Sequence, residues 1–180
     1  MENNWLGSKS GQGFYKKVKG ENGKNMILGL DLETLEYRKG KKANFPTLEL
    51  TKSVDLVIDR FKILIAGKDK AGEFYRKSFA LMFAYVSKRI PEISEEFYKI
   101  DDAMKAGFGW ENGPYEIWDA IGVEKGIELM KEVGKEPATW VADMLASGIK
   151  SFYIVKNGAT YYYDIIQKKH ILLNFCKYPH

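Results

Sequence analysis

The sequence predicts a mainly α-helical protein with short β-hairpins near both ends, and three observations support this fold class. Apolar residues recur at helical spacing over most of residues 54–148. A glycine-rich corner at residues 107–113 separates two of the predicted helices. Near the C-terminal end, Asn157 and Gly158 lie between two runs of aromatic and β-branched residues, which is typical of a hairpin with a type I′ turn.

The composition is that of a globular chain that can build a sizeable core. It has 180 residues, of which 45% are hydrophobic and 14% aromatic. The single cysteine, Cys176, excludes an intrachain disulfide, and the sequence has neither a membrane-spanning apolar run nor a signal peptide. These features predict a cytoplasmic protein with no membrane partner. A net charge of +4, with acids and bases interspersed, does not require a nucleic-acid partner.

Two helices are predicted in the first half of residues 54–148. The first begins with Ser53 as its N-cap and ends at Gly67, and the second begins after Asp69 and is stopped by Pro91. The second helix carries a broad apolar stripe that we expect to face the core. The stripe consists of Phe74, Ser78, Leu81, Met82 and Tyr85, broadened by Phe79, Phe83 and Val86.

The corner at residues 107–113 is the most specific local pattern in the chain. A third helix, beginning near Ser94, should end near Gly107, where glycines supply backbone freedom that a regular helix does not need. A fourth should begin with Asn112 or Gly113 as its cap and Pro114 in its first turn. Glu116 can then reach back to a free amide group of the cap. The apolar face of this helix would be formed by Ile117, Trp118 and Ile121.

The remainder of the chain alternates between helix and turn signals. A helix over residues 125–133 should end at Gly134, and another, with Pro137 in its first turn, should end near Gly148. Residues 170–175 form a short apolar tail. A hairpin is also predicted over residues 14–28, with its turn at Gly20 to Gly23, and it loosely echoes the C-terminal hairpin.

Residues 38–53 resemble an exposed connector. They contain Pro46 and concentrate basic residues at one end, namely Arg38, Lys39, Lys41 and Lys42. Such a run can meet the phosphate group of a ligand or a nucleic acid, but a solvated linker is the more frequent role of a charge run. We therefore assign no site to it, and nucleic-acid binding is the weakest of the functions considered.

The corner also resembles a known family. The strings GFGW, GPYE and WD are similar to the signature of the C-terminal helical domain of NAD-dependent 3-hydroxyacyl-CoA dehydrogenases. Residues Trp5 to Lys17 resemble the sequence that closes the same domain in that family. The signature positions are Phe108, Gly109, Trp110, Gly113, Pro114, Tyr115, Glu116, Trp118 and Asp119.

The resemblance implies an orthogonal helical bundle and a place in a longer, two-repeat enzyme. Residues 1–37 would then be the tail of a preceding helical repeat, 38–53 a linker, and 54–180 the helical domain with its terminal hairpin. The implied partners are the NAD-binding domain and first helical repeat of the parent protein, and acyl-CoA; a homodimer is a further option. Trp110, Tyr115 and Trp118 would form a packing surface or one wall of the acyl-CoA cleft, with Phe108 turned to the core. A purely intramolecular aromatic core is the alternative for all of them.

The sequence offers no catalytic or cofactor-binding constellation of its own. No strand leads into a GxGxxG turn, and His170 and His180 have no partner carboxylate in their sequence pattern. One cysteine and two histidines give no metal-ligand spacing, and Cys176 has no adjacent base. The acidic pairs, Asp101 with Asp102 and Glu116 with Asp119, fit helix caps.

We therefore expect no cofactor on this chain, NAD being held elsewhere in the parent enzyme, and no turnover by the chain alone. The family's helical domain also has an asparagine that faces the substrate, whereas the equivalent residues 78–89 contain none. The alternative to an enzyme fragment is a free-standing helical interaction or dimerisation module.

Overall fold

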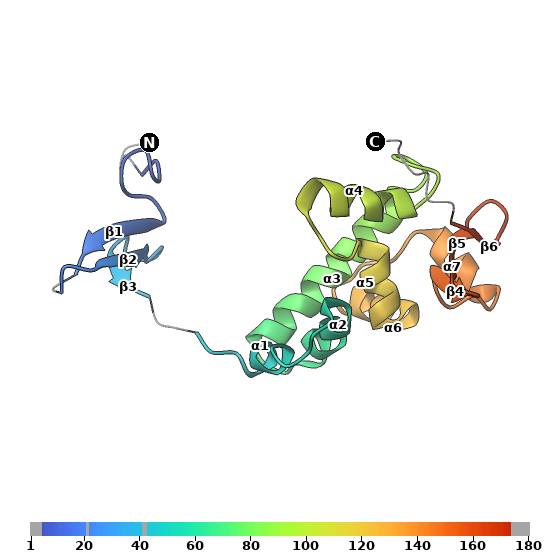
Figure 1. Ribbon diagram of the computed structural model, residues 1–180, viewed down its shortest axis with the longest axis horizontal. Helices are drawn as coiled ribbons and strands as arrows, with labels where there is room; N and C mark the ends of the chain where they lie inside the picture. Colours follow the sequence, from blue (N-terminus) through green and yellow to red (C-terminus); the bar gives the residue numbers. More distant parts are fainter. Residues whose placement is uncertain (1–4, 21, 41–42, 174–180) are drawn as a thin grey trace. The chain divides into compact units, whose positions relative to one another are not determined.

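The computed structural model describes residues 5–20, 22–40 and 43–173. It divides into two compact units, Met1–Asn44 and Phe45–His180, which are described separately (Figure 1). The division lies within the predicted connector of residues 38–53. Within the described ranges, no helix is both long enough and apolar enough to cross a membrane.

The first unit is a three-stranded antiparallel sheet, called here the first sheet. Its strands are β1 (Tyr15–Lys19), β2 (Asn25–Leu30) and β3 (Tyr37–Lys39), in that order. Tyr15 lies opposite Gly29 in the β1–β2 pair, so the predicted N-terminal hairpin is confirmed. The third strand was not predicted, because its three residues are too short to show an alternating pattern.

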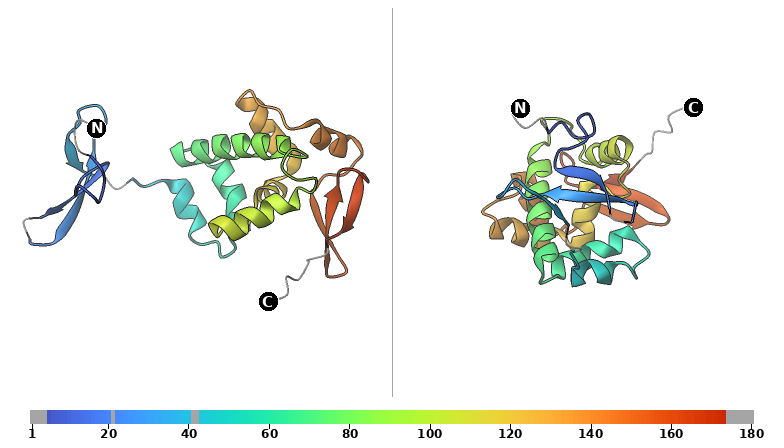
Figure 2. Two further views of the ribbon diagram at one scale, coloured as in Figure 1. Left: turned by 90° about the horizontal axis from the view of Figure 1, so that it is seen from above. Right: turned by 90° about the vertical axis from the view of Figure 1, so that its left-hand side faces the viewer.

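The second unit consists of seven helices and a second three-stranded sheet in its described part. The helices cross one another instead of running parallel (Figures 1 and 2). This confirms the predicted mainly α-helical fold. The helices are α1 (Pro46–Thr51), α2 (Val57–Ala66), α3 (Lys70–Lys88), α4 (Tyr98–Phe108), α5 (Pro114–Ile121), α6 (Val123–Glu132) and α7 (Thr139–Ala146).

The second sheet follows α7 and has the same strand order as the first. It consists of β4 (Tyr153–Lys156), β5 (Ala159–Asp164) and β6 (Lys169–Leu172), all antiparallel. Asn157 and Gly158 have φ angles of 52° and 75°, which confirms the predicted I′-type turn. β6 was predicted only as an apolar tail, and residues 174–180, including Cys176 and His180, lie outside the described residues.

Several predicted boundaries need correction. The connector contains α1, because Thr47 is anchored by two hydrogen bonds to the Asp69 carboxylate, at 3.0 and 2.7 Å. The next helix begins at Val57 with Leu56 as its N-cap, so Ser53 does not cap it. Two further helices begin a few residues later than predicted, at Tyr98 and Thr139.

The assignment of the apolar stripe on α3 to the core was partly wrong. Phe79, Phe83 and Val86 are buried, as predicted, together with Ala80 and Ala84. The other row is largely in solvent, since Phe74, Leu81 and Tyr85 have exposed fractions of 64%, 49% and 62%. Apolar side chains follow both sides of α3, and periodicity alone does not distinguish which side meets the other helices.

The core of the second unit is rich in aromatic rings. Phe83 stacks on Trp118 with ring centroids 4.8 Å apart, and Phe97 lies 4.7 Å from Tyr115. The polar tips of the two largest buried rings have acceptors: Trp118 Nε1 donates to the Val123 carbonyl at 3.0 Å, and the Tyr115 hydroxyl donates to the Val86 carbonyl at 2.9 Å. The predicted apolar face of α5 is therefore confirmed as the centre of the unit.

Candidate functional site

The corner between α4 and α5 has the predicted geometry. α4 ends at Phe108, and Gly109 follows in the left-handed conformation with a φ angle of 65°. Gly113 is the N-cap of α5, and its amide donates to Glu116 Oε2 at 2.8 Å. A side chain at residue 113 would collide with the backbone of Asp101, so only glycine permits this close approach of the two helices.

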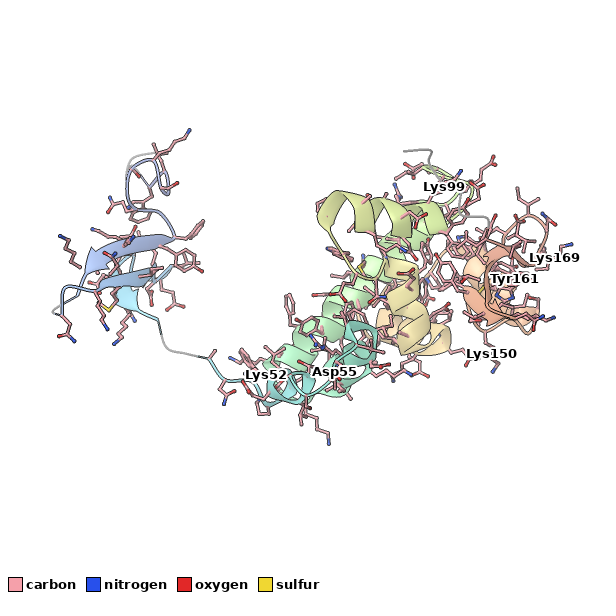
Figure 3. The ribbon with its side chains drawn as sticks, viewed as in Figure 1. Lys52, Asp55, Lys99, Lys150, Tyr161 and Lys169 are labelled. Carbon is pink, nitrogen blue, oxygen red and sulfur yellow. The ribbon has the colours of Figure 1, made fainter. Side chains whose placement is uncertain are left out.

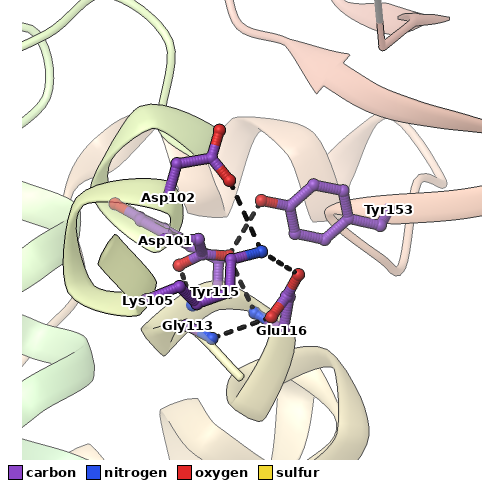
Figure 4. Close-up of polar contacts among 7 residues, drawn as sticks. All are labelled: Asp101, Asp102, Lys105, Gly113, Tyr115, Glu116 and Tyr153. Carbon is purple, nitrogen blue, oxygen red and sulfur yellow. Dashed lines mark hydrogen bonds and ion pairs between the residues drawn. The ribbon is translucent and has the colours of Figure 1, made fainter. Parts of the chain in front are cut away.

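Asp101 joins α4, α5 and the second sheet (Figure 4). Its carboxylate accepts hydrogen bonds from the amides of Tyr115 and Glu116, at 2.9 and 3.1 Å, in the first turn of α5. It also accepts from the hydroxyl of Tyr153 at 2.8 Å. The side chain thus caps a helix other than its own, where a negative charge is favoured.

Burial changes the acid–base behaviour of this cluster. Asp101 is completely buried, and desolvation raises the pKa of its carboxyl to about 7 against the opposing effect of its hydrogen bonds. Burial likewise raises the pKa of the Tyr153 hydroxyl, helped by the adjacent carboxylate. On the solvent side, Lys105 forms ion pairs with Glu116 at 2.8 Å and Asp102 at 3.4 Å.

Asp119, at the other end of the signature, binds the second sheet directly. Its two carboxylate oxygens accept from the amides of Phe152 and Tyr153 at 2.8 and 2.7 Å. Desolvation raises the pKa of this carboxyl to about 7 as well. Both aspartates therefore have partners for each oxygen and serve to join helices to the sheet, which agrees with the structural role that the sequence favoured.

A large apolar groove runs beside the corner. Its volume is about 930 Å³, and it is bordered by α3, α4 and the segment between them. Figure 3 marks one of its charged residues, Lys99, on α4. Its lining includes Met82, Tyr85, Arg89, Met104, Phe108 and Trp110.

The predicted signature residues fall into two groups, those that line the groove and those that do not. Phe108 and Trp110 line it, with exposed fractions of 74% and 38%. The prediction that Phe108 turns to the core was therefore wrong, because α4 ends there and the side chain extends into the groove. Tyr115 and Trp118 are fully buried and fit the intramolecular alternative. Pro114 also lines the groove, while Gly109, Gly113, Glu116 and Asp119 shape or anchor the corner.

The other features considered in the sequence for catalysis, metal binding or dinucleotide binding give no site near this groove. His170 belongs to β6, and its Nε2 atom lies 3.0 Å from the Ser151 carbonyl, where it supports the second sheet. Within the described ranges, no cluster of histidine, cysteine or acidic residues has the arrangement of a metal site. Both sheets of the described chain are antiparallel, whereas a dinucleotide-binding fold is built on parallel strands.

Comparison with known proteins supports the resemblance seen at the corner. A protein of Bacillus subtilis named "Probable 3-hydroxyacyl-CoA dehydrogenase" is 40% identical over 164 residues, which is 91% of this chain. Proteins of Rickettsia prowazekii and Rickettsia felis, both named "Putative fatty acid oxidation complex trifunctional enzyme", are 26% and 25% identical over 72% and 65% of the chain.

These matches cover only part of each relative. The chain spans 20% of the Bacillus protein and 16% and 15% of the two Rickettsia proteins. No family model and no solved structure matches the chain. The family resemblance predicted from the corner signature is nevertheless confirmed. The chain is related in sequence to a part of the 3-hydroxyacyl-CoA dehydrogenases.

Proposed function

We propose that this chain acts as part of a cytoplasmic 3-hydroxyacyl-CoA dehydrogenase, in which its helical unit forms one wall of the acyl-CoA cleft. The whole enzyme would oxidise 3-hydroxyacyl-CoA to 3-ketoacyl-CoA with NAD in fatty-acid β-oxidation. The names of the relatives support the reaction class. The groove is the main support for the proposed role, because it brings the signature residues Phe108 and Trp110 together on an open apolar surface.

The lining of the groove suits an acyl chain. Met82 and Met104 provide flexible side chains that adapt to irregular apolar ligands, and the rings of Phe108 and Trp110 provide flat contact area. A volume of about 930 Å³ lies within the range of small-molecule sites. Burying a methylene group of a ligand here would contribute about 0.8 kcal/mol.

Arg89 supplies a polar feature at the same groove. Its Nε atom is the only buried side-chain nitrogen or oxygen in the described ranges that lacks a hydrogen-bond partner. The same guanidinium forms an ion pair with Glu92 at 2.6 Å and lies over the Tyr85 ring. A buried donor without an acceptor costs free energy, so a ligand oxygen such as a thioester carbonyl would be favoured at Arg89.

In this proposal NAD is not bound by the helical unit. Hydride transfer needs a nicotinamide held against the substrate, and we place that function on a separate NAD-binding domain. The helical unit contributes apolar contact and excludes water from the acyl chain. The 180-residue chain by itself should therefore bind acyl-CoA weakly and show no turnover.

The proposal is tested by calorimetric titration of the chain with decanoyl-CoA, with free CoA as the comparison ligand. We expect saturable binding of decanoyl-CoA that Met104→Glu weakens at least about tenfold by placing a charge in the groove. The matched control is Leu56→Glu, since Leu56 is 64% exposed and is not a groove residue. Equal binding by both variants would contradict the cleft role. Clear NADH-dependent reduction of acetoacetyl-CoA by this chain would contradict the placement of NAD on another domain.

A second candidate function is a packing surface for another helical subunit or repeat. The exposed row of Phe74, Leu81 and Tyr85 on α3 favours it, because Tyr85 continues this row into the groove. In that case the chain should form a concentration-dependent dimer in sedimentation experiments, and Leu81→Glu should abolish it. A chain that stays monomeric at high concentration would count against a homodimer.

A further inference from the structure

Three asparagines in the chain are followed by glycine, at residues 22–23, 112–113 and 157–158. An Asn-Gly pair can lose the side-chain amide of its asparagine without an enzyme, because the glycine nitrogen can attack the Cγ atom of the asparagine. Glycine has no Cβ atom to obstruct the ring that forms. The three pairs share this chemistry, so the fold decides which of them reacts first.

The reaction consumes only water and takes place in two steps. The glycine nitrogen gives its proton to hydroxide and bonds to Cγ of the asparagine, and the bond from Cγ to the side-chain nitrogen breaks, so that ammonia leaves and a succinimide ring remains. Water then opens the ring at one of its two carbonyl carbons. Opening at Cγ gives aspartate, whereas opening at the backbone carbonyl carbon gives isoaspartate, in which the main chain runs through Cγ.

The glycine amide of the first pair is already engaged in a hydrogen bond. Gly23 donates its amide to the carbonyl of Gly20 at 2.9 Å. Asn22 is exposed, so its side chain has room to move. The attack on Asn22 nevertheless requires that this hydrogen bond be broken first, which slows the reaction.

The second pair is protected more strongly. The Gly113 amide donates to the carboxylate of Glu116 at 2.8 Å, and a hydrogen bond to a charged acceptor is stronger than one to a carbonyl. The same negative charge opposes loss of the amide proton. Gly113 is also buried and packs tightly against Asp101, which restricts the backbone rotation that ring closure at Asn112 needs.

The third pair has neither kind of protection. Asn157 and Gly158 are both exposed and form the turn between β4 and β5. Apart from its neighbours in the chain, no described atom lies within 4 Å of the position that a Cβ atom at Gly158 would take. Among the described residues, neither the Gly158 amide nor the Asn157 side chain has a hydrogen-bond partner.

Isoaspartate in this turn would disturb the second sheet. The turn pairs Lys156 with Ala159, and this register leaves a loop of only two residues. Isoaspartate adds a methylene group to the main chain of the loop and places a carboxylate beside it. Aspartate keeps the original main-chain length, and an Asp-Gly pair suits the same type of turn. Of the two products, isoaspartate is therefore the one that disrupts the strand pairing.

We propose that Asn157 is the site of spontaneous deamidation in this chain, and that isoaspartate formed there opens the β4–β5 hairpin. The free Gly158 amide distinguishes this pair from the other two. The proposal concerns the turn of the second sheet and does not depend on the proposed dehydrogenase function.

The test follows all three pairs in the 180-residue chain during incubation in mildly alkaline buffer. Peptide mapping by mass spectrometry detects the products, and chromatography separates aspartate from isoaspartate. The same incubation in urea gives the rate of each pair without the fold, and the ratio of the two rates is the protection factor of that pair. We expect the factor at Asn22 to exceed that at Asn157 at least about threefold, as for one added backbone hydrogen bond. At Asn112 the excess should be at least about tenfold, because its glycine amide is bound to a carboxylate.

A protection factor at Asn157 equal to or larger than that of either other pair would overturn the assignment of the site. The effect on the sheet is measured by hydrogen exchange of the β4 and β5 amides after incubation. We expect exchange at least about threefold faster in the fraction that carries isoaspartate, because the hairpin opens more often. Asn157→Gly is the matched control, since a Gly-Gly pair suits the turn and has no side-chain amide to lose. Unchanged exchange in the isoaspartate fraction, or an equal increase in the incubated control, would overturn the proposed opening of the hairpin.

Discussion

Phe14 and Phe152 occupy the same position in two sheets with the same strand order, yet their exposed fractions are 72% and 0%. The hydrogen bonds within the sheets are nearly alike, so local turn chemistry is enough to form such a sheet in both places. Among the described residues, the contacts that bury Phe152 come from an aromatic socket formed by Phe97, Tyr115, Trp118 and Trp140, and Asp119 accepts from its amide; no such contacts are found for Phe14 there. The second sheet therefore gains contacts from its helical partner that the strands alone do not provide, and such contacts matter because small sheets are marginal by themselves.

The largest expected difference between the two sheets is at the phenylalanines. Phe152→Ala should lower the free energy of unfolding of the second unit by about 3–5 kcal/mol, because it leaves a cavity among four aromatic side chains. Phe14→Ala should change the stability of the 180-residue chain by less than about 0.5 kcal/mol. Chemical denaturation followed by tryptophan fluorescence measures both. Equal effects would show that Phe14 is buried within the chain as Phe152 is, and would contradict the difference between the two sheets.

Asp101, which is buried, and Asp119, which is partly buried, should make the stability of the second unit depend on pH between pH 5 and pH 8. Their carboxyl pKa is near 3.8 when unfolded and raised to about 7 by burial when folded. Between these values the folded unit holds protons that the unfolded chain has lost, so its stability falls as the pH rises from 5 to 8. The loss should be on the order of 2–3 kcal/mol for one such carboxyl.

Denaturation midpoints measured across this range test the sign of the pH dependence. Asp119→Asn should remove part of the slope, because the substituted side chain does not ionise. The Asp31→Asn variant, which changes an aspartate of the first unit, is the control and should leave the slope of the second unit unchanged. A second unit that gained stability between pH 5 and pH 8 would contradict this assignment.

A smaller difference in stability is expected between substitutions of the tyrosines that begin the two sheets. Tyr153→Phe removes the hydrogen bond to Asp101 and should cost about 1–2 kcal/mol, because a buried acceptor loses a donor. Tyr15→Phe should be nearly neutral, since Tyr15 is 71% exposed. Thermal unfolding of the two variants provides the measurement, and a neutral Tyr153→Phe would show that this hydroxyl does not hold the sheet to α4.

The smallest effects concern contacts inside each sheet. Asp164→Ala removes the acceptor of the Gln167 amide and should weaken the second sheet by about 0.5–1 kcal/mol. Asp31→Ala removes the acceptor of the Thr34 amide and of the Glu33 amide, and should weaken the first sheet by at least as much. Hydrogen exchange of the Thr34 and Gln167 amides compares them directly. A clear difference between the two would mean that the turns are not equivalent.

Local rules predicted the corner almost completely. The Gly113 cap, Pro114 in the first turn and the return of Glu116 to the cap amide depend on neighbouring residues, and all three are present. The family signature also contains Phe108 and Trp110, which line the groove. The orientation of Phe108 was wrong, because exposure is decided by where α4 meets its neighbours.

Contacts between distant segments could not be predicted in the same way. The bonds from Asp119 to Phe152 and from Asp101 to Tyr153 join an acid on a helix to a strand much later in the chain. Nothing in their spacing indicates that they meet. Helix α1 was missed for a similar reason, because Thr47 is held by Asp69 and not by neighbours in the sequence.

Hydrogen exchange at four amides of the unmodified chain tests the comparison most directly. The amides of Phe152 and Tyr153 are buried against Asp119, whereas their counterparts at Phe14 and Tyr15 lie beside exposed side chains. We expect slow exchange at the first pair and fast exchange at the second. Equally slow exchange at all four amides would show that Phe14 and Tyr15 are protected as Phe152 and Tyr153 are, and would contradict the difference between the two sheets.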